Sequence, residues 1–196
     1  MLGAFTIDVV SDVVCPWCYI GKRRLEEALA RLREAEPDLP IAVRWHPFQL
    51  NPDLPREGTD RRGYLEAKFG GPERAQQIYA RVSAAGRTVD IPFAFDAIEK
   101  QPNTLDAHRL VAWAQGRHEG DLDALVERLF RAYFVDGRFI GDRDELARVA
   151  QEARSAVTSE WVAETVAVSV GRTVLRSSGP RIAPRVEAAQ PRREGA

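Results

Sequence analysis

Two stretches of alternating apolar and polar residues, separated by a helical pattern, open the chain. The first has apolar side chains at Phe5, Ile7 and Val9, the period of a half-buried strand, and ends at Ser11 and Asp12. Between residues 25 and 32, apolar residues recur every three or four positions, which predicts a helix packed on a sheet. A second alternation over residues 41–45 ends before Pro47. This order predicts a βαβ unit with two parallel strands.

The middle of the chain is predicted to be mainly helical. A loop rich in proline and glycine begins near Asn51, and two short helices are predicted at 61–69 and 72–85. Three further helical patterns run over 107–114, 122–133 and 146–153, and Asp142 with Glu145 forms a capping box before the last of them. We therefore predict an α/β protein in which an all-helical domain, residues 51–153, is inserted after a βαβ part, residues 1–50.

The end of the chain carries weaker patterns. Residues 154–170 are expected to return to the α/β part, either as a hairpin that turns at Gly171 and Arg172 or as a helix near Trp161. Residues 171–196 contain six Arg, two Glu and three Pro, so their local charge is +4. We expect this tail to be disordered, because it cannot bury enough apolar surface to order itself.

Composition and charge narrow the class of protein. The chain has 196 residues, of which 44% are apolar and 29% charged, enough for one sizeable core. Its 28 Lys and Arg nearly balance 29 Asp and Glu, so the net charge of −1 predicts neither nucleic acid nor an anionic membrane as a partner. No apolar run approaches the roughly 20 residues that span a bilayer, and the N-terminus has no basic region of the signal-peptide kind. We therefore expect a cytoplasmic protein.

The two cysteines of the chain lie together in Cys15-Pro16-Trp17-Cys18, at the predicted junction of the first strand and the first helix. Pro16 suits the first position of a helix, which makes Cys15 the expected N-cap. Unpaired N–H groups and the helix dipole there lower a thiol pKa from about 8.5 to between ~3.5 and ~7.5. Cys18, one turn later and expected to be more buried, would lie within disulfide reach. This asymmetry predicts that Cys15 attacks and Cys18 resolves the mixed disulfide.

Two other interpretations of the cysteine pair are open. The pair could fill space beside a sheet, or it could bind a metal ion. A metal site of this kind needs four ligands, and only three histidines, His46, His108 and His118, are present to complete it. We therefore favour redox chemistry at Cys15 and Cys18 and predict no metal.

Four further residues are candidates for substrate binding. Pro16 and Trp17 stand between the cysteines, Phe48 follows the second predicted strand, and His108 lies on a helical pattern that could face the dithiol. Asp12, three residues before Cys15, is expected to order the turn rather than to exchange protons.

Several segments resemble the FrnE-like branch of the DsbA family. They are, in chain order, Ser11-Asp12-Val13-Val14-Cys15-Pro16-Trp17-Cys18-Tyr19-Ile20-Gly21-Lys22; Trp45-His46-Pro47-Phe48-Gln49-Leu50-Asn51-Pro52; Asn103-Thr104-Leu105-Asp106-Ala107-His108-Arg109; and Leu129-Phe130-Arg131-Ala132-Tyr133-Phe134 with Gly141-Asp142. The resemblance covers about 1–153. It implies a thioredoxin-like fold with an inserted all-helical domain, and thiol–disulfide oxidoreductase activity at Cys15 and Cys18 on protein or small-molecule disulfides. It implies no cofactor, with glutathione as an optional co-substrate.

The same superfamily offers an alternative function. It includes glutathione-linked kappa-class transferases and 2-hydroxychromene-2-carboxylate isomerases, which usually carry Ser where this chain has Cys15. A glutathione-dependent isomerase or transferase that acts on an aromatic or polyketide-like substrate is therefore the second candidate. The presence of both cysteines favours the redox function.

The C-terminal part departs from the family pattern. Family members continue with a Gly-Val-Pro-Phe-like segment, whose cis-proline lies against the dithiol and whose following hairpin completes the sheet. The later prolines of this chain, Pro180, Pro184 and Pro191, have other neighbours. We hypothesise that a shifted reading frame replaces the native end from about 153–160, which would leave the antiparallel half of the sheet incomplete and the chain an inactive, truncated remnant. Resequencing codons 150–175 tests this hypothesis.

Overall fold

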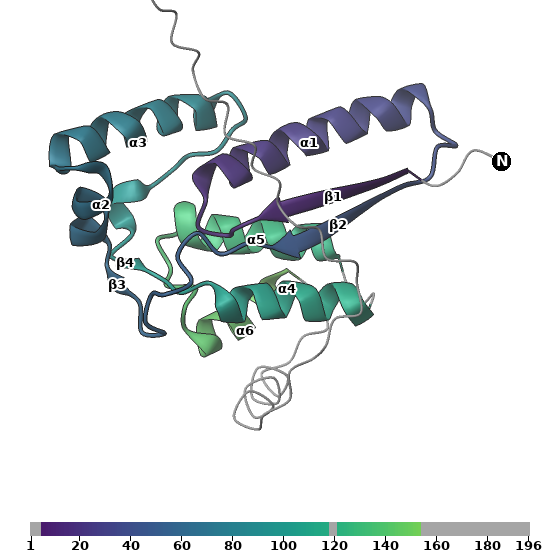
Figure 1. Ribbon diagram of the computed structural model, residues 1–196. Helices are drawn as coiled ribbons and strands as arrows, with labels where there is room; N and C mark the ends of the chain where they lie inside the picture. The colour runs from purple at the N-terminus through teal and green to yellow at the C-terminus, as the bar shows by residue number, and fades with distance from the viewer. Residues whose placement is uncertain (1–4, 118–120, 154–196) are drawn as a thin grey trace, which may run out of the picture.

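The computed structural model describes residues 5–117 and 121–153. It begins with the predicted βαβ unit, formed by β1 (Phe5–Ser11), α1 (Pro16–Ala35) and β2 (Ile41–Pro47) (Figure 1). The two strands are parallel, with Phe5 opposite Ile41 and Ser11 opposite Pro47. The predicted α/β class and the direction of the strands are therefore confirmed.

The two strands turn only one face toward the core. Val9 is half-buried and Trp45 is buried on that face, whereas Asp8 and Val10 point outward and are exposed. The outer edge of β2 is covered by Gln115 of α4 (Leu105–Arg117), which accepts the N–H of Trp45 at 2.7 Å and donates to its carbonyl at 3.2 Å. Within residues 5–117 and 121–153, no strand pairs with the other edge of β1.

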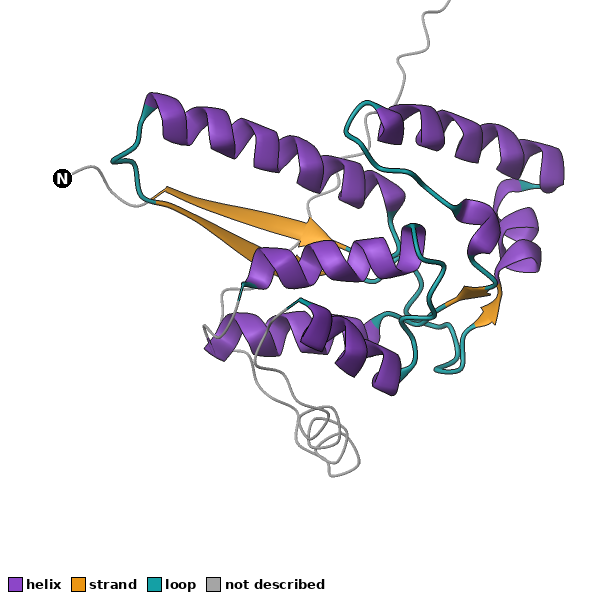
Figure 2. Cartoon of the chain, turned by 180° about the vertical axis from the view of Figure 1, so that it is seen from behind, coloured by secondary structure: helices purple, strands orange, loops and turns teal. Residues whose placement is uncertain are grey.

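The rest of the described chain is mainly helical, as predicted. It comprises β3 (Thr59–Asp60), α2 (Arg61–Phe69), α3 (Pro72–Arg87), the short 3₁₀ helix η1 (Phe95–Ala97), β4 (Lys100–Gln101), α4, α5 (Leu122–Phe134) and α6 (Arg143–Glu152). Gly70, at φ 80°, ends α2, and Pro72 begins α3. The Asp142 carboxylate accepts the N–H of Glu145 at 2.9 Å, which is one half of the predicted capping box. Figure 2 shows α2, α3 and the β3–β4 ribbon gathered at one end of the molecule.

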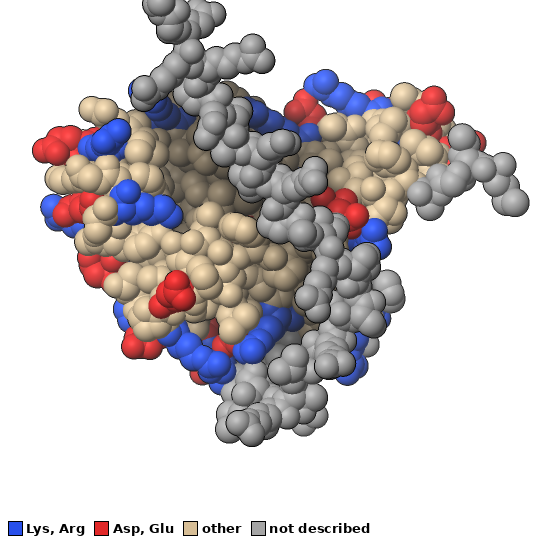
Figure 3. All heavy atoms as spheres, in the orientation of Figure 1, with Lys and Arg blue, Asp and Glu red and all other residues tan. Residues whose placement is uncertain are grey.

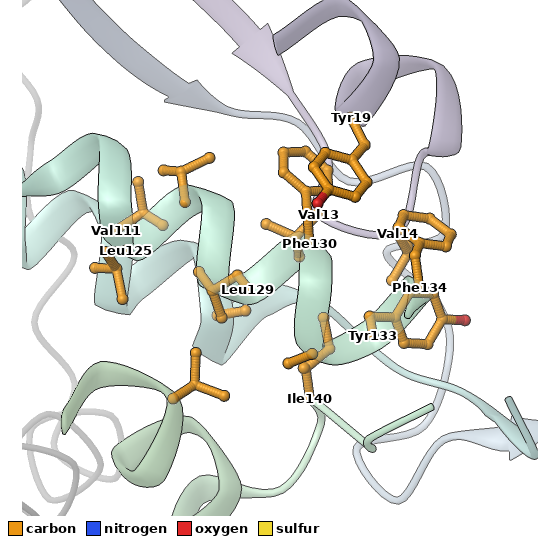
Figure 4. Close-up of a cluster of buried hydrophobic side chains, with 14 of the residues drawn as sticks. Val13, Val14, Tyr19, Val111, Leu125, Leu129, Phe130, Tyr133, Phe134 and Ile140 are labelled. Carbon is orange, nitrogen blue, oxygen red and sulfur yellow. The ribbon is translucent and has the colours of Figure 1, made fainter. Parts of the chain in front are cut away.

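The hydrophobic core is built around α5. Its fully buried side chains include Leu125, Leu129, Phe130, Tyr133, Phe134 and Ile140 (Figure 4). Tyr19, which directly follows Cys18, stacks on Phe130 with the ring centroids 5.0 Å apart. One cluster of buried side chains therefore runs from the start of α1 into the helical part. The division of the chain into domains at residues 50 and 51 stays a prediction.

A buried lysine fixes α1 to α5. The Lys22 side chain is 1% exposed, and its Nζ lies 3.0 Å from an oxygen of Asp123 and 3.3 Å from one of Glu127. It also pairs with Glu26 of its own helix. Burial lowers the pKa of the Lys22 ammonium group, but the carboxylates of Glu26 and Asp123 raise it by more. The net effect is a raised pKa, so Lys22 stays charged. The first turns of α1, which carry the cysteine pair, are therefore held by both ring stacking and ion pairs.

The predictions for 154–170 and for the tail 171–196, including the shifted reading frame, lie outside the described residues. None of the helices in the described ranges has the length and apolar character that a bilayer crossing requires.

Candidate active site

The cysteine pair lies after the end of β1, at the start of α1. Figure 1 shows this junction of the two elements. Cys15 has an extended backbone, with φ −96° and ψ 110°, and Pro16 is the first residue of the helix. The carbonyl of Cys15 accepts the N–H of Cys18 at 3.0 Å and that of Tyr19 at 3.2 Å. The predicted N-cap position of Cys15 is thus confirmed, and its thiol lies at the positive end of the helix.

The two thiols are free. The hydrogen bond between the sulfurs lowers the pKa of Cys18 to about 6 and, together with burial, raises the pKa of Cys15. The first proton of the pair is therefore lost more readily than that of an ordinary thiol, and the second less readily.

The pKa of Cys18 is the one that is lowered, whereas the sequence predicts the thiolate on Cys15. The N–H groups of Cys18 and Trp17 do lower the pKa of Cys15, but the hydrogen bond to the Cys18 sulfur outweighs them. Both cysteines are partly buried, so the attacking role of Cys15 and the greater burial of Cys18 stay predictions.

Asp12 orders the turn that carries the pair. Its carbonyl accepts the N–H of Cys15 at 2.9 Å, and its carboxylate accepts the N–H of Leu50 at 2.7 Å. The other carboxylate oxygen lies 3.2 Å from Nε2 of His108, and both of these side chains are buried. Asp12 therefore connects the cysteine turn to the loop after β2 and to α4.

A pocket of about 280 Å³ opens beside Cys15, and we name it the Cys15 pocket. Pro16 and Trp17 of α1 form one wall, Leu50 and Asn51 contribute from the loop after β2, and α2 and α3 form the opposite wall. The side chains from α2 and α3 are Tyr64, Leu65, Lys68, Phe69, Ile78, Tyr79 and Val82. Figure 3 shows the surface hollowed between α3 and the start of α1. Cys15 therefore faces a largely apolar space.

A second depression, of about 410 Å³, lies beside β2 and α4. It is lined by Phe48 and His108, neither of which lines the Cys15 pocket. The structure thus brings two of the four substrate-binding candidates, Pro16 and Trp17, together with Cys15. It places the other two on this separate surface, where His108 reaches the cysteine turn only through Asp12.

Comparisons with known proteins agree with this geometry. The family model of the DSBA-like thioredoxin domain matches residues 6–165. The chain belongs to this family. The match confirms the DsbA resemblance and extends past residue 153, where the resemblance by motifs ends. The FrnE-like subtype within the DSBA-like family stays a prediction.

Solved structures show the same DSBA-like fold. A probable DsbA oxidoreductase from Streptomyces coelicolor matches with a TM-score of 0.70 and 28% identity, over 83% of this chain and 67% of that chain. A protein from Nitrosomonas europaea shares the fold with a TM-score of 0.55 and 14% identity, over 83% of this chain and 70% of that one. YwbO of Bacillus subtilis (strain 168) is 27% identical over 146 residues, which are 74% of this chain. The chain spans 64% of the length of YwbO.

Several lining residues of this DSBA-like site were not predicted. Leu50 and Asn51 lie in a segment that carries the family resemblance, but no chemistry singled them out. Tyr64 and Lys68 are one helical turn apart, a spacing that puts them on one face of α2. Nothing in the local sequence indicates that this face lies opposite Cys15.

Proposed function

We propose that this protein is a thiol–disulfide oxidoreductase that exchanges electrons between Cys15 and Cys18 and the disulfide of a protein or small molecule. The observation that carries the proposal is the place of the cysteine pair: Cys15 is the N-cap of α1 and lines the Cys15 pocket, and its hydrogen bond to Cys18 lowers the pKa of the second thiol to about 6. A thiolate is the species that attacks a disulfide. The family and the match to a probable DsbA oxidoreductase support the same activity.

The first step is attack by Cys15. Its thiol proton passes along the existing hydrogen bond to Cys18, which leaves the negative charge on the Cys15 sulfur beside the N–H groups of Trp17 and Cys18. The start of α1 stabilises this charge. The Cys15 sulfur attacks one sulfur of the substrate, a Cys15–substrate disulfide forms, and the second substrate sulfur leaves as a thiolate.

The second step is resolution by Cys18. Its thiol gives the proton to the departed thiolate, and its sulfur attacks the Cys15 sulfur and releases the rest of the substrate as a thiolate, which takes a proton from water. The protein ends with a Cys15–Cys18 disulfide and the substrate with two thiols, so two electrons have moved. In the cytoplasm that the sequence predicts, the pair would be kept mostly reduced and this direction would prevail. The dithiol itself carries the electrons, so the cycle requires no resident cofactor.

Single serine variants separate the two roles. Cys18→Ser should accumulate a disulfide between Cys15 and glutathione, because no second thiol resolves it, whereas Cys15→Ser should lose exchange. Mass spectrometry after incubation with glutathione disulfide measures the adduct, and insulin reduction measures turnover. A Cys15→Ser variant as active as the wild type would end the proposal.

The same variants test the alternative of a glutathione-dependent isomerase or transferase. Such an enzyme does not cycle through an internal disulfide, so it would keep its activity without Cys18. Activity that requires glutathione and survives Cys18→Ser would therefore replace the redox proposal.

A further inference from the structure

The Cys15 pocket has walls suited to one aromatic ring. Its aromatic lining residues are Trp17, Tyr64, Phe69 and Tyr79. Its volume of about 280 Å³ is near the lower end of the roughly 300–1,000 Å³ found for small-molecule pockets. A single ring with small substituents fits such a space.

The positively charged side chain of Lys68 lines the pocket from α2. Lys68 is exposed and lines the pocket, and its Nζ donates to the hydroxyl of Tyr64 at 2.9 Å and lies 5.3 Å from the centre of that ring. The Tyr64 hydroxyl donates to the side-chain oxygen of Asn51. These two hydrogen bonds cross from α2 to the loop after β2 and hold the ammonium group at the pocket.

A second positive charge lies behind the pocket wall. Arg61 is 3% exposed, and its Nη1 donates to Oε1 of Gln101 at 2.9 Å and to the hydroxyl of Tyr133 at 2.6 Å. Its Nη2 is buried without a hydrogen-bond partner, and no carboxylate in the described ranges forms an ion pair with it. The guanidinium lies 5.3 Å from the centre of the Tyr79 ring. Gln101 and Tyr79 both line the pocket, so the guanidinium lies directly behind this part of the wall.

Lys68 is the one charged side chain among the described residues that line the pocket. Arg61 lies behind the wall at Gln101 and Tyr79, and the buried carboxylate of Asp12 lies behind the wall at Leu50. Apolar walls lower the local dielectric constant and so strengthen the field of Lys68 inside the pocket. We propose, on the basis of the proposed exchange at Cys15, that the pocket receives small disulfides that carry a carboxylate on an aromatic ring, and that Lys68 binds the carboxylate.

The exchange is balanced for such a substrate. The Cys15 thiolate attacks the sulfur attached to the bound ring, a Cys15–aryl disulfide forms, and the other aryl thiolate leaves. Cys18 then gives its proton to water, and its sulfur attacks the Cys15 sulfur and releases the second aryl thiolate. The protein loses two electrons and becomes a disulfide, and the aryl disulfide gains two electrons and becomes two aryl thiolates.

Two aromatic disulfides that differ in charge test the inference. The reduced full chain is mixed in a stopped-flow instrument with dithiobis-nitrobenzoate, which has a carboxylate on each ring, or with uncharged dithiodipyridine. The rate constant for dithiobis-nitrobenzoate is divided by that for dithiodipyridine, and this ratio is divided by the ratio measured for mercaptoethanol. The resulting normalised ratio reports the preference of the pocket for negative charge. We expect the wild type to prefer the charged disulfide more strongly than mercaptoethanol does.

Variants of Lys68 locate the preference. The normalised ratio should fall by about threefold in Lys68→Gln, which is the effect of one partly exposed ion pair, and recover in Lys68→Arg. Arg74→Gln is the matched control, because it removes an exposed charge on α3 from a residue that does not line the pocket.

Each outcome has a separate meaning. A ratio unchanged in Lys68→Gln, or reduced equally in Arg74→Gln, would overturn the inference while leaving the exchange activity intact. If the proposed function itself is wrong, the reduced wild type will not end as the Cys15–Cys18 disulfide, and Cys15→Ser will reduce insulin as fast as the wild type.

Discussion

The sheet and the helical part of this protein are covered to very different extents. Around α5, Leu129 and Phe130 are 0% exposed, whereas Val10 of β1 is 63% exposed on the open face of the sheet. The cysteine pair lies between these regions, and the helix that carries it rests on α5 through Tyr19 and Lys22. The position of the candidate active site therefore depends on the packing of α1 against the helices more than on the two strands.

The largest effect expected from this difference is that of Phe130→Ala. The ring of Phe130 is fully buried and stacks on Tyr19, so its removal should leave a cavity under the cysteine turn. We predict a loss of about 3–5 kcal/mol in the free energy of unfolding, measured by urea denaturation of the reduced protein.

Val10→Ala is the matched control on the open sheet face. Because Val10 is mostly exposed, its truncation should change the free energy of unfolding by no more than about 0.5 kcal/mol. Equal losses for Phe130→Ala and Val10→Ala would contradict the comparison of the two regions. A wild type without any cooperative transition would instead support the truncated-remnant alternative.

An effect between those of Phe130→Ala and Val10→Ala is expected from Tyr19→Phe. This change keeps the stacked ring but removes the hydroxyl that donates to Glu127 at 2.7 Å. Glu127 keeps its hydrogen bond from Arg23 at 2.6 Å, so we predict a loss of about 1 kcal/mol in the free energy of unfolding. A loss as large as that of Phe130→Ala would show that the hydroxyl, and not the ring, holds α1 to α5.

The local pattern of the sequence was sufficient for most elements of the fold. The alternation at Phe5, Ile7 and Val9 corresponds to β1, and Pro16 marks the first residue of α1. The strands β3 and β4 were missed, because a two-residue strand such as Thr59–Asp60 has no periodicity to detect. Their pairing is set by tertiary contacts, among them the hydrogen bond between Arg61 and Gln101.

The residues of the candidate site also fall into two groups: those that the local sequence places, and those that only long-range packing places. Cys15 and Cys18 are adjacent to one helix start, so their spacing and Pro16 were enough to place them. The Cys15 pocket needs α2 and α3 to lie opposite α1, and Lys68 and Tyr79 enter it only through that long-range packing. The helix-end argument for Cys15 leaves out the hydrogen bond between the two sulfurs, which lowers the pKa of Cys18 and raises that of Cys15.

The pH titration of the reduced pair, followed by the ultraviolet absorbance of the thiolate, tests the central claim most directly. The pKa of Cys18 is lowered to about 6, so the thiolate should form as the pH rises through that value, and only one of the two thiols should ionise there. In Cys15→Ala, which lacks the hydrogen-bond donor, the midpoint should rise toward the ordinary thiol value of about 8.5. Two thiols that ionise together near that ordinary value in the wild type would contradict the account.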